Sequence, residues 1–293
     1  MMKKNIAIKI IVFIILLSNI FILTGCSKNN EDNMNEKVDQ HIDFLDRKII
    51  SMLNLINNIS FTDYGVVTEE ITKDNQQTEE KADSESDKAS SSDSSDMGSQ
   101  TSIEDKKPTI KTEVKEANIL NSQRITDWKT LKTSIENLST SWTSIVLDLY
   151  KVNVNNNDII DFEKTLDETI ISIKDENKTK SLENLTILYS YLPRYLEAYS
   201  DNEIISITKT KYNILEAYSI VEKNDWKLTK QKIIDAENNF MSIVNNTENK
   251  SNQLTINKIY ILIKEMQNSI DLKDLDLFYI KYKAVMVEIE FIS

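Results

Sequence analysis

Residues 128–149 read WKTLKTSIENLSTSWTSIVLDL. Their large apolar side chains recur at alternating steps of three and four: Trp128, Leu131, Ile135, Leu138, Trp142, Ile145 and Leu149. Because an α-helix completes a turn in 3.6 residues, this spacing brings all seven side chains to one face. The stretch therefore predicts an amphipathic helix that packs against a core.

The same spacing continues to the end of the chain. It predicts further helices over residues 159–173, 182–196, 207–221, 226–244, 254–270 and 275–292, with a kink at Pro193. An aspartate stands just ahead of several apolar runs and is expected to cap the first turn: Asp127, Asp158, Asp225 and Asp274. The short polar breaks between the runs suggest antiparallel helical hairpins packed side by side.

Glycine is absent from residue 109 to residue 293. Tight β-turns and phosphate-binding loops need positive φ or close backbone approach, which glycine supplies. This composition argues against a nucleotide-binding fold and a β-sandwich. The unequal spacing of the capping aspartates also argues against a regular repeat array. We therefore expect residues 109–293 to form an all-α domain, an irregular helical bundle.

Two different segments precede this domain. Residues 34–60 carry an apolar seam close to a coiled-coil repeat, formed by Val38, Ile42, Leu45, Ile49, Met52, Ile56 and Ile59. The seam predicts a separate amphipathic helix, and the sequence leaves open whether it docks on the bundle or dimerises. Residues 61–108 include SESDKASSSDSSDMGSQTS and lack periodicity, which predicts a disordered acidic linker. A specific acidic interaction tail is the alternative.

The N-terminus has the layout of a secretory signal. Lys3, Lys4 and Lys9 precede or enter an apolar run that ends at Leu23-Thr24-Gly25-Cys26. This ending resembles the lipobox of the bacterial prolipoprotein class. The resemblance covers only residues 1–26, and it implies cleavage after residue 25 and lipid attachment to Cys26. Residues 26–33 would then be a tether, and the mature chain would sit on the extracytoplasmic face of the cell membrane. An uncleaved membrane helix is the alternative.

Few residues suited to catalysis or metal binding are present. Cys26 is the only cysteine and His41 the only histidine, so we predict no thiolate site, no histidine-based catalytic or metal site and no cofactor. Asn153, Asn155 and Asn157 alternate as in a calcium loop, but Asp158 replaces the glycine of that motif, which favours a turn. Removing residues 1–25 takes away three lysines and no acid, which changes the formal net charge from −12 to −15. So acidic a chain is a poor candidate for nucleic-acid binding.

The aromatic feature that stands out is Tyr191, Tyr195 and Tyr199 at steps of four. These side chains belong either to the core and its boundary or to a groove that stacks on peptide or sugar. We expect a non-catalytic binding or scaffold lipoprotein, with a protein or cell-wall partner. The linker is expected to act as a spacer that lets the domain range from the bilayer. A solute-capturing lipoprotein of a transporter and a carboxylate-only wall hydrolase are the alternatives, and the oligomeric state stays open.

Overall fold

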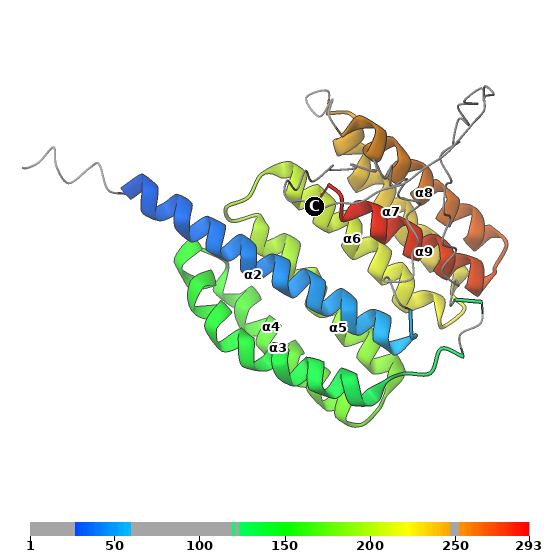
Figure 1. The fold of residues 1–293 in the computed structure, drawn as a ribbon, viewed down its shortest axis with the longest axis horizontal. Coiled ribbons are helices and arrows are strands. Elements are labelled where there is room, and N and C mark those ends of the chain that lie inside the picture. Colours follow the sequence, from blue (N-terminus) through cyan, green and yellow to red (C-terminus); the bar gives the residue numbers. More distant parts are fainter. Residues whose placement is uncertain (1–26, 60–118, 121–122, 247–251, 293) are drawn as a thin grey trace, which may run out of the picture. The chain divides into compact units, whose positions relative to one another are not determined.

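The computed structural model describes residues 27–59, 119–120, 123–246 and 252–292, with side chains from Asn33 onward. All of these residues belong to one compact unit, which comprises residues 1–61 and 117–293 (Figure 1). The predicted signal peptide, Cys26 and the predicted linker over residues 61–108 lie outside the described residues.

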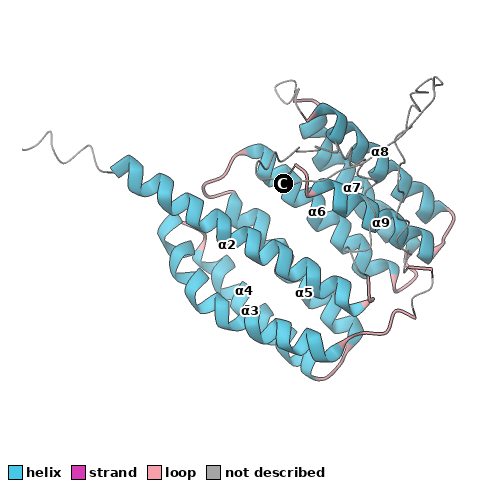
Figure 2. Cartoon of the chain, viewed as in Figure 1, coloured by secondary structure: helices cyan, strands magenta, loops and turns pink. Residues whose placement is uncertain are grey.

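Helices account for most of the described chain, and the described residues include no strand (Figure 2). The predicted all-α class is therefore confirmed. The helices are α2 (Ser27–Ile56), α3 (Trp128–Leu149), α4 (Asn156–Lys174), α5 (Lys178–Leu196), α6 (Asn202–Val221), α7 (Trp226–Val244), α8 (Gln253–Asp271) and α9 (Leu275–Ile289). A single 3-10 turn, η1 (Tyr150–Val152), follows α3. Helix α2 begins at Ser27, inside the segment predicted as a tether.

Side-chain caps fix where the helices begin. Asp127, Asp225 and Asp274 each accept a backbone hydrogen bond from the first turn of their helix, as predicted. The prediction for Asp158 is wrong, because Asn155 caps α4 and Asp158 lies within its first turn. A carboxylate there still complements the positive end of the helix dipole. The caps of α5 and α6, Asn177 and Asp201, were not predicted.

The turns use left-handed backbone without glycine. The described residues with positive φ that are not glycine are Asn58, Arg124, Asn153, Glu176, Asn224 and Lys273. Most of them follow the end of a helix, where glycine is the usual residue. Asparagine tolerates this conformation, whereas Glu176 and Lys273 adopt it at a steric cost. Residues other than glycine thus occupy these positive-φ turns, and the described part of the chain has no strands that would need tight β-turns.

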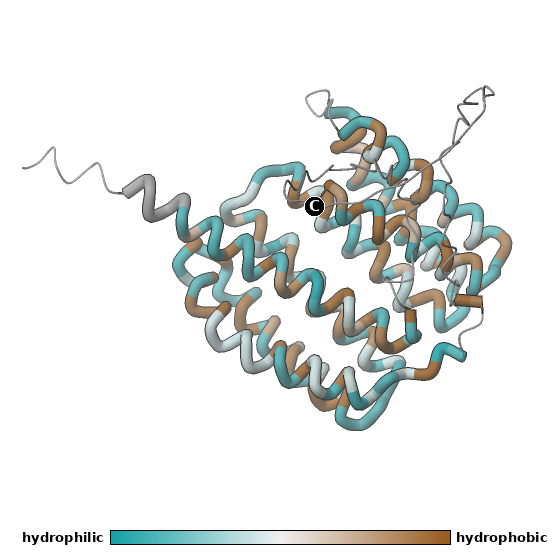
Figure 3. The backbone as a smooth tube through the Cα atoms, in the orientation of Figure 1, coloured by the Kyte–Doolittle hydropathy of each residue, from teal (hydrophilic) through white to brown (hydrophobic). Residues whose placement is uncertain are grey.

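Consecutive helices pack on one another from α3 to α9, and α9 also returns to contact α6. The connections between most of these neighbours are short, which gives the predicted arrangement of antiparallel hairpins (Figure 1). Apolar positions alternate with polar ones along each helix, as the coloured tube shows (Figure 3). The apolar sides meet in one continuous core.

Helix α2 packs into this bundle against α3, α5 and η1. All seven side chains of the predicted seam are buried, and Val38, Leu45, Ile49, Met52 and Ile56 are fully so. Burial of one such side chain stabilises by roughly 1.5–3 kcal/mol. The seam is therefore the main attraction between α2 and the other helices. This packing answers the question of docking that the sequence left open.

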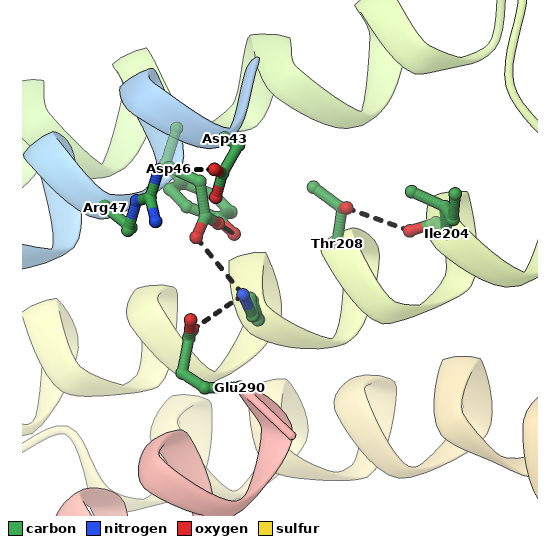
Figure 4. A network of polar contacts seen from close by, with 8 residues as sticks. Asp43, Asp46, Arg47, Ile204, Thr208 and Glu290 are labelled. Carbon is green, nitrogen blue, oxygen red and sulfur yellow. Dashed lines mark hydrogen bonds and ion pairs between the residues drawn. The ribbon is translucent and has the colours of Figure 1, made fainter. Parts of the chain in front are cut away.

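A buried ionic cluster adds specificity to the packing of α2 (Figure 4). The Asp46 carboxylate of α2 accepts hydrogen bonds from the Tyr189 hydroxyl of α5 and, at 3.1 Å, from the Lys211 ammonium of α6. The same ammonium group donates to Glu290, just beyond α9, at 2.8 Å. Burial alone lowers the pKa of Lys211, but the Asp46 and Glu290 carboxylates outweigh it and raise that pKa above its usual value. Lys211 is thus a buried cation whose partners come from two other helices.

Amide and phenol groups continue this contact toward the C-terminal end of α2. The Asn57 amide donates to the hydroxyls of Tyr218 and Tyr279 at 3.0 and 3.1 Å, and the Tyr282 hydroxyl donates to Asn54 at 2.9 Å. The Tyr218 hydroxyl donates to the backbone carbonyl of Leu53 at 2.9 Å. A slip of α2 along its axis would break all four bonds. The polar groups therefore fix the register of a helix that the apolar seam attracts.

No helix within the described ranges combines the length and the apolar character that a bilayer crossing needs.

Candidate functional site

The predicted binding surface of Tyr191, Tyr195 and Tyr199 is mostly inside the protein. Tyr191 is 7% exposed and Tyr195 is 0% exposed, so neither ring can stack on a ligand. Tyr199 is half-buried, and burial together with the nearby Asp39 carboxylate raises the pKa of its hydroxyl. The prediction of a tyrosine groove is therefore wrong for Tyr191 and Tyr195.

These two tyrosines belong to an aromatic cluster between α3, α4 and α5. The ring of Phe162 stacks on Trp142 with centroids 4.1 Å apart, and Tyr191 meets Phe162 edge-on at 5.8 Å. The Tyr195 hydroxyl donates to the Asp158 backbone carbonyl at 3.2 Å. Aromatic pairs of this geometry add to the stability that burial alone provides. The tyrosine periodicity thus marks the core side of α5.

A polar cavity lies on a neighbouring face of the same helix. It has a volume of about 790 Å³ and is open to solvent. We name it the amide pocket, because four asparagines contribute to its lining. The lining residues are Asn153, Asn155, Asp158, Ser190, Pro193, Arg194, Glu197, Ala198, Lys209, Tyr212, Asn213 and Asn239.

The pocket draws on helices α4 to α7 and on the turn after η1. Along α5, Ser190, Pro193, Arg194 and Glu197 follow steps of three, one and three, which places them on one face. The buried tyrosines occupy the adjoining face. The polar cavity therefore borders the face of α5 that carries Pro193, and not the face that carries Tyr191 and Tyr195. The helix continues through Pro193 and ends at Leu196.

Two ion pairs balance the charge of the amide pocket. Arg194 Nη1 lies 3.1 Å from Asp158 Oδ1, and Lys209 Nζ lies 2.7 Å from Glu197 Oε1. The Arg194 guanidinium also lies over the Tyr191 ring, 5.1 Å from its centroid. Each cation in the pocket thus has an anion beside it. The pocket presents donors and acceptors together, with no excess charge of either sign.

Amide and phenol groups complete the lining. The Asn155 side chain accepts from the Asn157 backbone amide at 2.9 Å, and Asn213 donates to the Lys209 carbonyl at 3.1 Å. Burial and the nearby Glu216 carboxylate raise the pKa of Tyr212, so its hydroxyl remains protonated at neutral pH. The half-buried Tyr212 ring offers an apolar surface among these polar groups. Such a lining suits a neutral ligand that carries hydroxyl and amide groups.

The Ser190 hydroxyl and both carboxylates of the pocket have partners within the protein. The Ser190 hydroxyl donates to the Ile187 carbonyl at 2.7 Å, and both carboxylates are held in the ion pairs described above. Enzymatic hydrolysis of a glycoside by carboxyl groups needs one carboxylic acid as proton donor and a second carboxylate as base or nucleophile. Among the residues that the structure places, no group of three or more His, Cys, Asp or Glu side chains could hold a metal ion.

A second polar cluster surrounds Asp148 at the opposite end of α2 from Asn57. Lys37, His41 and Lys151 place nitrogen atoms 2.7, 3.0 and 2.7 Å from its carboxylate oxygens. Hydrogen bonds from Lys151 and Lys37 hold the pKa of Asp148 far below its usual value. His41, the only histidine in the sequence, thus contacts α3 directly through Asp148. We interpret this cluster as a structural contact between α2 and α3.

Sequence reasoning missed the amide pocket because its lining comes from five segments spread over 87 residue positions. The sequence predicts a turn at the alternating Asn153 and Asn155. The structure agrees, because Asn153 has a positive φ and Asn155 caps α4. Cys26 and the lipobox residues lie outside the described residues, so their role stays a prediction. In comparisons with protein-family models, characterised proteins and solved structures, nothing matches the chain.

Proposed function

We propose that this protein is a lipid-anchored, extracytoplasmic binding protein of a bacterial envelope. The amide pocket would hold a neutral segment of a cell-wall polymer that bears hydroxyl and amide groups. The observation that carries the proposal is the lining itself, which combines four asparagines, two balanced ion pairs and one half-buried tyrosine. The signal-like N-terminus and the lipobox supply the expected location.

The chemistry of the lining narrows the ligand. Side-chain amides donate and accept at once, which matches the hydroxyl and N-acetyl groups of an amino-sugar polymer. The Tyr212 ring can stack on the apolar face of a sugar ring while its hydroxyl remains a donor. A strongly charged ligand would have to displace one partner of an ion pair. An apolar ligand would displace water from the polar lining groups without replacing the hydrogen bonds of that water.

The two alternative functions find less support in this geometry. A receptor that captures a small solute encloses most of the ligand surface, whereas the amide pocket is open to solvent. An open pocket suits a polymer that continues beyond the site. A carboxylate-only hydrolase would need a free proton donor, and Asp158 and Glu197 are each held by a cation.

Binding to isolated wall glycan, measured by co-sedimentation, tests the proposal. We expect Tyr212→Ala to weaken binding roughly tenfold, which corresponds to about 1.4 kcal/mol. Tyr260→Ala is the matched control, because Tyr260 is also half-buried on a helix but does not line the pocket. Helical content by circular dichroism verifies that both variants fold.

Equal binding by wild type, Tyr212→Ala and Tyr260→Ala would refute the assignment of the pocket. Absence of binding to any wall glycan, combined with recovery of one protein by in-cell crosslinking through position 212, would replace the glycan with a protein partner.

A further inference from the structure

The position of α2 relates the predicted anchor to the bundle. Helix α2 begins at Ser27, the residue after Cys26. Among the α2 side chains that the structure describes, Val38 is the first that is fully buried, and Lys37 pairs with Asp148 of α3 at 2.7 Å. Eleven residues of helix separate Ser27 from Val38, which is about 16 Å. The anchor would thus connect to the folded bundle through three helical turns that project past the neighbouring helices (Figure 1).

The acidic segment does not lie between the anchor and the bundle. Ile59, before it, and Ile119, after it, are both 6% exposed and belong to the same hydrophobic core. The residues on either side of the segment thus belong to one bundle. The segment follows α2 in the sequence, so it adds no distance between Cys26 and α2. This corrects the expectation that residues 61–108 act as a spacer from the membrane.

One end of the bundle lies where α2 enters it, and we call it the entry end. It comprises η1, the last turn of α3 and the first turns of α4, since η1 packs on α2 and Asp148 pairs with Lys37. Leu147, Tyr150 and Ile160 are 62%, 49% and 56% exposed there. The ammonium groups of Lys37 and Lys151 lie at the same end, each 2.7 Å from an Asp148 carboxylate oxygen.

We propose that the entry end faces the bilayer that carries the lipid anchor, and that α2 holds the bundle close to that surface. The proposal rests on the proposed lipid anchor at Cys26. Exposed aliphatic and phenol side chains at the same end as lysine ammonium groups suit the boundary between lipid and water. Three carboxylates, Glu36, Asp39 and Asp201, also lie near this end. Burial is the main cause that raises the pKa of Asp39, and the charges of Asp201 and Glu36 raise it further. The lipid anchor and α2, rather than attraction between charges, therefore hold the entry end close to the bilayer.

Energy transfer to labelled lipid headgroups measures this orientation. The full-length lipidated protein is placed in phosphatidylcholine vesicles with one added cysteine, either Ile160→Cys or Ile171→Cys, that carries a donor dye. The two positions are matched, because they lie on α4 with exposures of 56% and 55% and are separated by eleven residues. Acylation consumes the thiol of Cys26, the only native cysteine, so the added thiol is the only one labelled.

We expect the dye at position 160 to lie closer to the headgroups by up to about 16 Å, the rise of eleven helical residues. Deleting residues 70–106 should leave both distances unchanged, because the acidic segment adds no spacing. Equal distances at positions 160 and 171, or a clear approach to the membrane after the deletion, would overturn the proposal. Protein that floats with the vesicles but gives equal distances refutes the orientation alone. Protein that carries no lipid and does not float refutes the anchor, and the orientation with it.

Discussion

Replacement of Asp46 by asparagine tests how α2 is joined to the bundle. The change removes one charge from a buried contact and keeps the side chain close to its original size. Asp46 accepts from Tyr189 and from Lys211, whose side chain is 3% exposed. Asp43→Asn is the matched control, because Asp43 lies three residues earlier on α2 and pairs with Arg47 on the surface.

The structure gives the size of the expected effect. Removal of one partner from a buried ion pair typically destabilises by about 3–5 kcal/mol. Lys211 keeps the Glu290 carboxylate at 2.8 Å, and an asparagine can still accept from Tyr189. We therefore expect Asp46→Asn to lower the free energy of unfolding by about 2–3 kcal/mol. The exposed pair of Asp43 and Arg47 is worth about 0–1 kcal/mol.

Urea unfolding of the mature chain, followed by circular dichroism at 222 nm, measures both variants. For a domain of this size, the loss at Asp46 corresponds to a fall in Tm of about 4–12 °C. The slope of unfolding free energy against urea should not change, because α2 unfolds with the bundle. If Asp46→Asn lies within about 0.5 kcal/mol of Asp43→Asn, Asp46 does not hold α2 in the way described.

Three further predictions concern stability. Lys151 and Lys37 are the main causes that lower the pKa of Asp148 in the folded state. The stability that this carboxylate contributes is therefore present above the unfolded pKa of 3.8 and is lost as the pH falls through the folded value. Asp148→Asn should lower the free energy of unfolding by about 2 kcal/mol at neutral pH and flatten the acid limb of a stability-versus-pH curve. Asn184 is fully buried, and neither of its side-chain polar atoms has a partner among the described groups. Asn184→Leu should therefore raise the free energy of unfolding, measured in urea, by about 1 kcal/mol. A loss of stability would instead indicate an ordered water beside Asn184. Lys273 has a φ of 53°, so Lys273→Gly should stabilise by roughly 0.5–1 kcal/mol, whereas Lys258→Gly within α8 should destabilise by about 1 kcal/mol.

Local patterns in the sequence predict most of the helices. The run from Trp226 to Val244 matches α7 at both ends, since an aspartate cap and a polar break mark the boundaries. The α4 cap was misassigned because several asparagines precede Asp158, and only the backbone geometry shows which of them accepts the first-turn amide. Periodicity gives the apolar face of a helix, whereas the boundary of that face depends on neighbours distant in sequence.

The candidate site shows this limit most clearly. Tyr191 and Arg194 lie one turn apart on α5, yet one faces the aromatic cluster and the other lines the amide pocket. The seam of α2 was plain in the sequence, but its partner surface is built by α3 and α5, more than seventy residues further along the chain. Pairings such as Asp46 with Lys211 leave no local signal, because each residue alone is an ordinary polar position.

The intact mass of the protein extracted from cell membranes tests the anchor, on which the location and the orientation depend. We expect a chain that begins at Cys26 and carries a diacylglyceryl group with additional acyl mass on that cysteine. Cys26→Ala should abolish the lipid and block cleavage. A membrane-bound wild-type chain that retains residues 1–25, carries no lipid and takes up no labelled fatty acid would contradict lipid attachment at Cys26, and would favour an uncleaved N-terminal membrane helix instead.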